Sequence, residues 1–344
     1  MLYFIIMKIK AVSLFSGGLD STLATKIVQE NNIDVLALNF YTGFCTIEFK
    51  RILGKEKNVE NPVVKMADMI NVPLEIINIT EEYLEMLTKP KFGYGKAVNP
   101  CIDCRIMMLK KASEYIKNGK ASFVITGEVL NQRPMSQFLN TLNLIEKESG
   151  LKGLILRPLS AQLLPPTIPE INGWIKRENL YAIKGRTRKI QIELAKKFGI
   201  KDYFQPSGIC CFLTDKNYAK RFFDFVKHNE KITTDDIMLM KIGRHFRINN
   251  KLIVGRFEEE NKFLEKYKKD KIFIYPEKHK GPSAIMYENP SEEEIEIACS
   301  ILARYCDKED DKEIPIIVKV KDNLEKIIKS IPMDENLIKI YSIK

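Results

Sequence analysis

A glycine-rich segment, Ser16-Gly17-Gly18-Leu19-Asp20-Ser21, constrains the fold of this 344-residue chain more than any other feature. It follows a short apolar run, Lys10 to Phe15, and precedes Thr22 to Glu30, whose apolar residues fall on one helical face. The segment is therefore predicted to join a strand to a helix. Two glycines let such a turn bring backbone amides close to a ligand, and the following helix presents unpaired N–H groups and its positive dipole end to an anion.

The side chains of this segment fit a nucleotide phosphate. We expect Ser16 and Ser21 to add hydroxyl donors, and Asp20 to help hold a Mg²⁺ ion that accompanies a nucleotide. The Gly-Lys-Ser/Thr ending of loops that cradle the terminal phosphates of ATP is missing, so γ-phosphate transfer is not expected. The plainer alternative is a strand–helix turn with Asp20 in the first helical turn.

Strand and helix signals alternate through the first half of the chain. Further strands are predicted at Val35 to Phe40, Leu74 to Ile79 and Ser122 to Thr126, and further helices at Val63 to Ile70 and Arg105 to Lys117. Such alternation implies right-handed crossovers and a doubly wound parallel sheet, an α/β fold. Because ligands of these sheets bind beyond the carboxyl ends of the strands, the turns after Phe15, Phe40 and Thr126 are candidate binding segments.

The second half has a different pattern. Leu163 to Pro169 holds three prolines and is predicted to be an extended bend. Two helices are expected after it, at Glu170 to Glu178 and Arg188 to Phe198. From about Thr233 short alternating runs surround one clear helix, Ser291 to Tyr305, which is an α+β pattern. We therefore predict three parts: an ATP-binding domain (1–165), a helical extension with a second cysteine site (166–230) and a smaller α+β domain (231–344).

The seven cysteines suggest an intracellular protein with reactive or metal-bound thiols rather than a disulfide framework. Cys101 and Cys104 open the helix expected near Arg105, where the helix dipole and the arginine would depress a thiol pKa. Cys210 and Cys211 are adjacent in a later loop. The pattern leaves three interpretations open: a structural zinc site, persulfide chemistry, or a [4Fe–4S] cluster held by three cysteines with one iron open to carry a sulfide. The remaining cysteines, Cys45, Cys299 and Cys306, are expected in the core.

The formal net charge of +10 suggests a polyanionic partner. Two segments, Lys176 to Lys201 and Lys241 to Lys280, are rich in Lys and Arg. Each is either a solvated face or a contact to RNA phosphates, and two of them beside a nucleotide site favour RNA. The apolar start, Met1 to Met7, is too short to cross a bilayer, so we expect a cytoplasmic protein without a membrane partner.

The glycine-rich segment resembles the pyrophosphate loop of the PP-loop ATP pyrophosphatase superfamily, whose members split ATP into AMP and pyrophosphate and adenylate a substrate oxygen. Further segments stand in the order found in tRNA thiolation enzymes: Pro100-Cys101-Ile102-Asp103-Cys104, Thr126-Gly127-Glu128, Gln132-Arg133-Pro134-Met135-Ser136-Gln137, Leu156-Arg157-Pro158-Leu159 and Ser207-Gly208-Ile209-Cys210-Cys211-Phe212. Over residues 8–228 the chain thus resembles 2-thiouridine and 4-thiouridine synthases of tRNA. Two departures leave the target base open: no tRNA-binding module is seen ahead of the phosphate loop, and Gln132-Arg133 replaces the Gly-His of the 2-thiouridine enzymes.

A second resemblance covers the chain from about Ile242. Val254-Gly255-Arg256, His279-Lys280-Gly281-Pro282-Ser283 and the helix that ends at Tyr305 resemble the RNA-binding domain of ribosome-quality-control factors of the fibronectin-binding-like family. The resemblance implies that this domain binds RNA.

Together the two resemblances imply an ATP-dependent tRNA sulfurtransferase that adenylates a base carbonyl, replaces its oxygen with sulfur and releases AMP and pyrophosphate. The implied catalytic residues are Cys101, Cys211 and Asp20. The implied ATP and Mg²⁺ site comprises Ser16, Gly17, Gly18, Asp20, Ser21, Leu38, Asn39, Phe40, Thr126 and Gly127, with Leu38 to Phe40 on the adenine side. A [4Fe–4S] cluster would be held by Cys101, Cys104 and Cys211, or Cys210 in its place; Cys211 is favoured because Cys-Phe-Leu-Thr fits the family phrase better.

Two other functions remain open at this stage. A related adenylating enzyme, such as a deazaguanine nitrile synthase, would act on a small molecule without RNA. A non-catalytic RNA-binding protein would keep only a vestigial nucleotide site. For the sulfurtransferase, the expected partners are tRNA or another RNA and a sulfur donor, either a protein or inorganic sulfide, and a homodimer is left open.

Overall fold

The computed structural model describes residues 9–54, 61–201, 203, 211–229, 231–287, 289–307, 312–320 and 324–343. By its internal contacts the chain divides into two compact units: Met1–Cys45 with Asn58–Cys210, and Thr46–Lys57 with Cys211–Lys344. This division differs from the one expected. Residues 166–230 are shared between the units, with the boundary at Cys211 rather than near residue 230, and a short segment from the first half belongs to the second unit.

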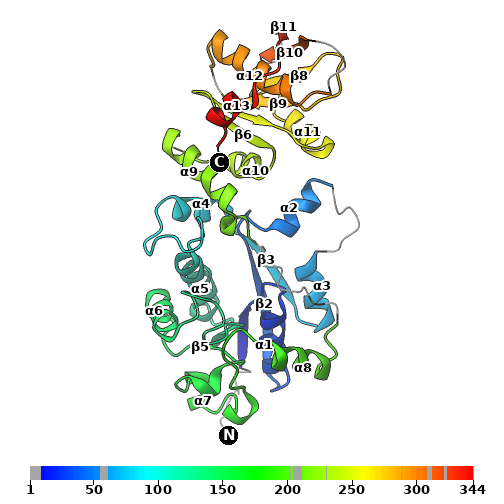
Figure 1. Ribbon diagram of the computed structural model, residues 1–344. Helices are drawn as coiled ribbons and strands as arrows, with labels where there is room; N and C mark the ends of the chain where they lie inside the picture. Colours follow the sequence, from blue (N-terminus) through cyan, green and yellow to red (C-terminus); the bar gives the residue numbers. More distant parts are fainter. Residues whose placement is uncertain are drawn as a thin grey trace. The chain divides into compact units, whose positions relative to one another are not determined.

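The first unit is built on a parallel sheet (Figure 1). Its strands are β1 (Lys10–Leu14), β2 (Asp34–Tyr41), β3 (Leu74–Asn78), β4 (Phe123–Thr126) and β5 (Ile155–Leu156). Their order is β3-β2-β1-β4-β5, and each neighbouring pair is parallel. The predicted doubly wound α/β fold is confirmed.

Helices cover both faces of this sheet (Figure 1). The helices of the unit are α1 (Leu19–Gln29), α3 (Pro62–Met69), α4 (Thr80–Thr88), α5 (Cys101–Lys117), α6 (Leu139–Ser149), α7 (Ile168–Ile171) and α8 (Lys189–Lys197), with short 3₁₀ turns η1 (Ala161–Leu163) and η2 (Arg177–Asn179). Helices α1, α3 and α8 share one apolar core with the sheet, whereas α5 packs against β1, β4 and α6. The helix predicted at Glu170 to Glu178 is wrong, because extended backbone at Lys176 separates α7 from η2.

The strand order fixes where a ligand can bind. From β1 the chain adds β2 and β3 on one side, and it returns to place β4 on the other side of β1. The connections that leave β1 and β4 therefore diverge to opposite sides at neighbouring carboxyl ends, which is the topological switch point of the sheet. The glycine-rich segment follows β1, and Thr126-Gly127 lies at the end of β4.

The second unit is built on an antiparallel sheet. Its strands are β6 (Arg244–Arg247), β7 (Lys251–Val254), β8 (Ile272–Pro276), β9 (Ala284–Met286), β10 (Ile314–Val320) and β11 (Leu324–Ser330), in the order β11-β10-β8-β9-β7-β6. Its helices are α2 (Thr46–Ile52), α9 (Lys216–His228), α10 (Thr234–Leu239), α11 (Glu258–Glu265), α12 (Glu292–Arg304) and α13 (Glu335–Tyr341), preceded by the turn η3 (Phe212–Thr214). The predicted α+β class of this part is confirmed.

Two apolar clusters flank this sheet. One cluster packs α12 and α13 against it, and the other includes residues of α10 and α11 together with Phe49 of α2. Phe49 contacts the rings of Phe212 and Phe263 with centroid separations of 5.4 and 6.2 Å. This aromatic contact explains why the segment around α2 belongs to the second unit although its sequence lies between β2 and α3.

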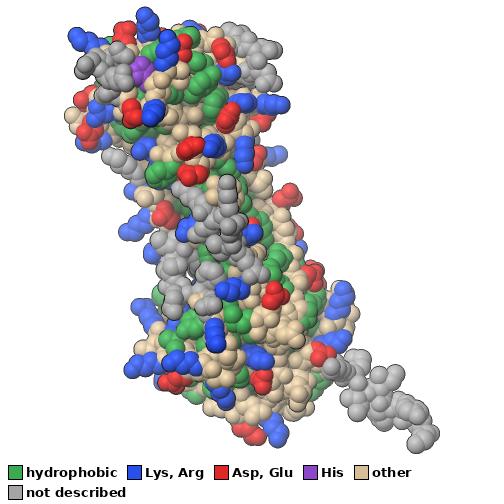
Figure 2. Space-filling model, turned by 90° about the vertical axis from the view of Figure 1, so that its right-hand side faces the viewer, with side chains coloured by type: hydrophobic (Ala, Val, Ile, Leu, Met, Phe, Trp, Pro, Cys, Tyr) green, Lys and Arg blue, Asp and Glu red, His purple; other side chains and the backbone are tan. Residues whose placement is uncertain are grey.

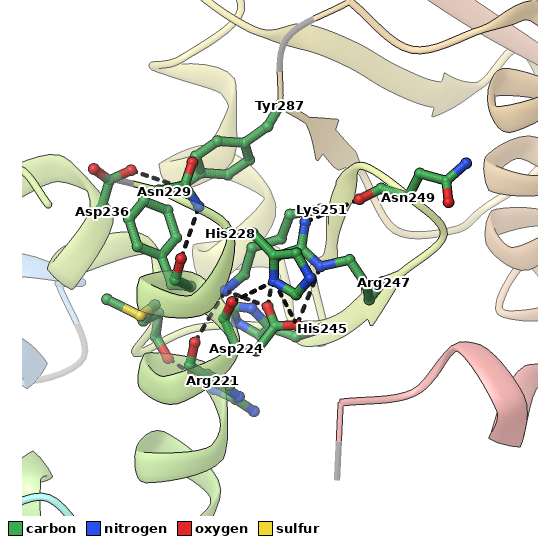
Figure 3. Close-up of polar contacts among 12 residues, drawn as sticks. Arg221, Asp224, His228, Asn229, Asp236, His245, Arg247, Asn249, Lys251 and Tyr287 are labelled. Carbon is green, nitrogen blue, oxygen red and sulfur yellow. Dashed lines mark hydrogen bonds and ion pairs between the residues drawn. The ribbon is translucent and has the colours of Figure 1, made fainter. Parts of the chain in front are cut away.

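A polar cluster around the buried Lys251 fastens α9 to the same sheet (Figure 3). Arg247 of β6 donates to both carboxylate oxygens of Asp224, at 3.1 and 2.6 Å, and the Lys251 ammonium lies 3.4 Å from Oδ2. Arg221, one turn earlier, donates to the carbonyl oxygens of Met240 and Gly243 at 2.9 and 3.0 Å. These contacts hold α9 to the β6–β7 hairpin, so the helix packs with the antiparallel sheet, although the expected boundary near residue 230 places it in the preceding part.

The burial of Lys251 makes the stability of this unit depend on pH. Burial lowers the pKa of Lys251 to about 8, against an ordinary value of 10.5, although Asp224 acts to raise it. Above pH 8 the unfolded chain keeps this proton and the folded chain does not, so the free energy of unfolding should rise with pH until about 10.5, by about 3 kcal/mol for this group. Urea unfolding of the wild type and Lys251→Met between pH 7 and 10 measures the effect. The wild type should gain stability relative to the variant, and parallel profiles would contradict the argument.

Candidate functional site

The glycine-rich segment forms a tight turn between β1 and α1, as predicted. Gly17 has a φ of +71°, and a Cβ there would lie 2.9 Å from Val63 Cα, so the position requires glycine. Gly18 is the N-cap of α1, and its carbonyl oxygen accepts hydrogen bonds from the hydroxyls of Ser21 and Thr22 at 2.9 and 3.0 Å. The amides of the first turn of α1 therefore remain available to an anion.

The end of β4 supports this turn by direct backbone packing. A Cβ on Gly127 would lie 2.5 Å from Ser21 N and 2.6 Å from the carbonyl carbon of Asp20. Thr126 is fully buried, and its hydroxyl donates to Glu128 at 3.1 Å. The predicted segments after β1 and β4 thus meet, and Gly127 allows the backbone of one to lie against the other.

Asp20 is held by two residues that sequence reasoning did not assign to the site. Its Oδ2 accepts from Gln132 Nε2 at 2.6 Å and lies 3.3 Å from an amino nitrogen of Arg188. Gln132 in turn accepts from Gln191 at 3.1 Å. Asp20 Oδ1 is buried and has no hydrogen-bond partner among the residues that the structure describes. An anionic oxygen of this kind, beside a phosphate-binding turn, fits a magnesium ligand.

The last residues of β2 support the turn from the other side. The amide of Phe15 donates to Leu38 O at 2.9 Å, and Asn39 Nδ2 donates to Phe15 O at 2.8 Å. Leu38 is fully buried and Phe40 almost so. These contacts fix the exit of β1, and contact of this stretch with adenine stays a prediction.

Cys101 and Cys104 lie in the first turn of α5, which begins four residues earlier than predicted. The Nε of the next residue, Arg105, lies 3.2 Å from Glu128, two residues beyond β4. Glu128 also pairs with the buried Arg157 at 3.0 Å. The two cysteines are therefore anchored at the same edge of the sheet as the glycine-rich turn.

The charges of this anchor are mutually stabilised. Burial alone would raise the pKa of Glu128, but Arg105 and Arg157 outweigh it and hold that pKa below its ordinary value. Glu128 is thus an anion with two cationic partners. Removing one partner from such a buried group leaves an uncompensated charge, which makes Glu128 a strong structural link between α5 and β4.

The expected depression of the thiol pKa is wrong for Cys104. Burial raises the pKa of Cys104, and this outweighs the opposing effects of Arg105 and a hydrogen bond from Tyr83. Cys104 is therefore a neutral thiol near pH 7. The first turn of a helix favours a thiolate, but at Cys104 the desolvation of the sulfur disfavours the charged form more strongly.

A loop connects the Asp20 region with Cys101. A Cβ placed on Gly95 would lie 3.9 Å from the sulfur of Met135 and 4.0 Å from the sulfur of Cys101. Met135 is three residues from Gln132, the partner of Asp20, and has a φ of +68°, which is rare for a residue with a side chain. Gly95 therefore lies near both Met135, in the loop after β4, and the thiol of Cys101.

Cys211 belongs to the second unit, where it precedes η3 and its carbonyl oxygen accepts from the Thr214 hydroxyl at 2.8 Å. Cys210 lies outside the described residues. Within the described part of the chain, no three His, Cys, Asp or Glu side chains gather as a metal site. Cys45 is only partly buried, in contrast to the expectation of a core position, whereas Cys299 and Cys306 are buried as expected.

Some Lys and Arg side chains of the two basic segments are buried or paired within the protein. Lys241 and Lys251 are buried, and Arg188 pairs with Asp20, so these side chains are not phosphate contacts on an open face. On the described part of the face drawn in Figure 2, Lys and Arg side chains are interspersed with Asp and Glu rather than gathered in one patch. No helix among the described residues has the length and apolar character needed to cross a membrane.

Comparison with known families agrees with this division. Residues 7–163 match the model described as "Thiamine biosynthesis protein (ThiI)", and residues 243–342 match the "NFACT protein RNA binding domain". The chain thus matches a ThiI model over its first part and an NFACT RNA-binding model over its last part. Both resemblances inferred from the motifs are confirmed.

Three known proteins illustrate the similarity. A tRNA-specific 2-thiouridylase MnmA of Petrotoga mobilis is 25% identical over 296 residues, which are 78% of this chain and 73% of that protein. A probable tRNA sulfurtransferase of Thermococcus kodakarensis is 29% identical over 150 residues, 44% of this chain and 36% of that protein. The structure of a 4-thiouridine synthetase–RNA complex with bound ATP has 24% identity and a TM-score of 0.34, covering 56% of this chain and 43% of that one.

Gly127→Ala should weaken ATP binding at least tenfold, because the new methyl group would collide with the backbone of Asp20 and Ser21. Calorimetric titration with ATP and Mg²⁺ measures the loss. Gly119→Ala is the control: a Cβ there meets nothing within 4 Å, so this variant adds a methyl group without a collision, although the φ of Gly119, at +68°, is positive and that of Gly127 is not. Equal losses in the two variants would show a general folding defect instead.

The raised pKa of Cys104 predicts slow alkylation. In a Cys101→Ser background, the modification of Cys104 by iodoacetamide should be slower at pH 7 than that of a free cysteine, and its rate should still be rising above pH 9, because only the thiolate reacts. Peptide mass spectrometry follows the modification. A rate that is already maximal at pH 7 would contradict the assignment.

Proposed function

We propose that this chain is an ATP-dependent tRNA sulfurtransferase. The observation that carries the proposal is the convergence, within the first unit, of a phosphate-binding turn and a pair of cysteines on one edge of the sheet. Gly127 packs on Asp20 and Ser21, and Glu128, the next residue, holds Arg105 beside the cysteines. The ThiI domain, the NFACT RNA-binding domain and the tRNA-thiolating relatives support it.

Thiolation of a base needs both the phosphate-binding turn and the cysteines. A uridine carbonyl oxygen is a poor leaving group, so the oxygen first attacks the α-phosphate of ATP, which releases pyrophosphate and forms an adenylate ester. Sulfur then attacks the carbonyl carbon that bears this ester, and AMP departs with the original oxygen. The amides and hydroxyls of Ser16 to Ser21 would hold the leaving pyrophosphate. Mg²⁺ on Asp20 Oδ1 would neutralise phosphate charge.

The sulfur is proposed to be handled by Cys101, Cys104 and Cys211, and two routes remain. A [4Fe–4S] cluster would use the three thiolates as ligands, and metal binding would remove the proton of Cys104. A persulfide route would need a nucleophilic thiol, for which the raised pKa of Cys104 makes Cys101 or Cys211 the better candidate. The proposed donor is a protein that transfers sulfane sulfur to the thiol in the persulfide route, or a protein or inorganic sulfide that supplies sulfide in the cluster route, and the NFACT domain would bind the tRNA.

Substitution of the cysteines tests the function. In a strain that lacks the gene, tRNA nucleosides should lose one thiolated uridine, and the wild-type gene should restore it. Cys101→Ser and Cys211→Ser should not restore it, whereas both purified variants should keep ATP–pyrophosphate exchange, because adenylation precedes sulfur transfer. Cys299→Ala, in the core of the second unit, is the control and should restore the nucleoside.

Each rival function gives a different result. An unchanged thionucleoside profile in the deletion strain, together with AMP formation without RNA, would support an enzyme that acts on a small molecule. Absence of both exchange and nucleotide binding would support a non-catalytic RNA-binding protein. A broad visible absorbance shoulder after anaerobic purification would identify the cluster route, and its absence from active protein would favour the persulfide route.

A further inference from the structure

Helix α9 carries a basic stripe on its exposed face. Lys216, Lys220, Phe223 and Lys227 follow the spacing i, i+4, i+7 and i+11, which places them along one face of the helix. All four are exposed, and the Phe223 side chain is 46% exposed. The other face packs into the unit through the buried residues Tyr218, Phe222 and Phe225. We call the exposed face the α9 stripe.

The stripe contains no opposing charge. The one acidic residue of α9, Asp224, lies beside the stripe and is bound to Arg247 and Lys251 of the β6–β7 hairpin (Figure 3). The Asp215 carboxylate before the helix accepts from the amide of Tyr218 at 2.7 Å and caps the N-terminus. The acidic residue of α9 and the one that caps it are therefore occupied, and the opposite side of the helix is held by buried contacts.

We propose that the α9 stripe is an RNA-contact surface, with the three lysines on phosphates and Phe223 stacked on an unpaired base. The stripe spans about 16 Å along the helix, the length of several nucleotides. Lysines that flank an exposed aromatic ring are the combination that binds single-stranded or looped nucleic acid. The stripe lies outside residues 243–342, which match the NFACT RNA-binding model, but it belongs to the same compact unit.

This assignment extends the RNA surface toward a cysteine. Cys211 lies five residues before Lys216 and belongs to the same unit. RNA bound along the α9 stripe would therefore be held next to the segment that begins with the proposed sulfur-handling thiol. That this RNA is a substrate rests on the proposed function. Contact with RNA, however, can be measured without any turnover.

The salt dependence of RNA binding tests the lysines. Total tRNA is titrated onto the full chain and onto a Lys216→Gln/Lys220→Gln/Lys227→Gln variant between 50 and 200 mM KCl. The slope of log affinity against log salt should become shallower by about 2 to 3, because about three counterion-releasing contacts are lost. The control, Lys117→Gln/Lys147→Gln/Lys152→Gln, removes three exposed lysines from the first unit and should keep the wild-type slope. Equal slopes in wild type and stripe variant, or equal losses in both variants, overturn the proposal.

Two substitutions of Phe223 test stacking. Phe223→Leu should weaken tRNA binding about tenfold, whereas Phe223→Trp should retain it, because stacking needs a ring rather than an apolar side chain alone. Equal binding by both variants overturns the stacking role, and circular dichroism checks that both are folded. If the stripe variants bind RNA normally while the wild type thiolates tRNA, only this inference fails. If they lose RNA while no thiolation is found with any variant, the proposed function fails and the RNA contact stands.

Discussion

The candidate site depends on one backbone contact, the approach of Gly127 to the first turn of α1. With 2.5 Å between a hypothetical Cβ and Ser21 N, no larger residue allows β4 to end against the phosphate-binding turn. The contact joins the two loops that diverge at the switch point of the sheet. Together with the hydrogen bonds within the turn and those from Asn39 and Gln132, this support fixes the amides of the turn in place before any ligand arrives.

A chain of polar contacts extends from this point. Asp20 is held by Gln132 from the loop after β4 and by Arg188 from the start of α8, and one carboxylate oxygen is left without a protein partner. Glu128 carries the connection to Arg105, which fixes the first turn of α5 and its cysteines. Pairing of the buried charges fixes the geometry of this edge of the sheet, because breaking any pair would leave an unpaired charge without contact to water.

In the second unit, pairing of charges likewise fixes one element on another. Asp224 accepts from Arg247 and lies within ion-pair distance of Lys251, and the buried cluster fixes α9 on the sheet while the opposite face of the helix remains exposed. The helix thus belongs with the RNA-binding fold. The expected helical extension between the two domains is not a separate part, because its second half packs with the C-terminal sheet.

The sequence predicted much of the first unit correctly because its signals are local. The turn at Ser16 to Ser21, the apolar runs of β1, β2 and β4 and the α5 cysteines depend on the spacing of residues near one another in the chain. Helix α2 was missed, because its apolar side chain, Phe49, finds its partners in a distant part of the chain. The raised pKa of Cys104 was also missed, since it follows from burial that a helix-terminus argument does not contain.

By itself the sequence determined the strand–turn–helix cradle, the pair of thiols at a helix start and the change from a parallel to an antiparallel pattern. Only the tertiary structure decided that Gln132 and Arg188, 112 and 168 residues away, meet Asp20, and that Cys211 and α9 belong to the C-terminal unit. The physical reason is the range of the interactions. Backbone propensity and apolar periodicity act between neighbours in the chain, whereas pairing of buried charges depends on which surfaces the packed elements bring together.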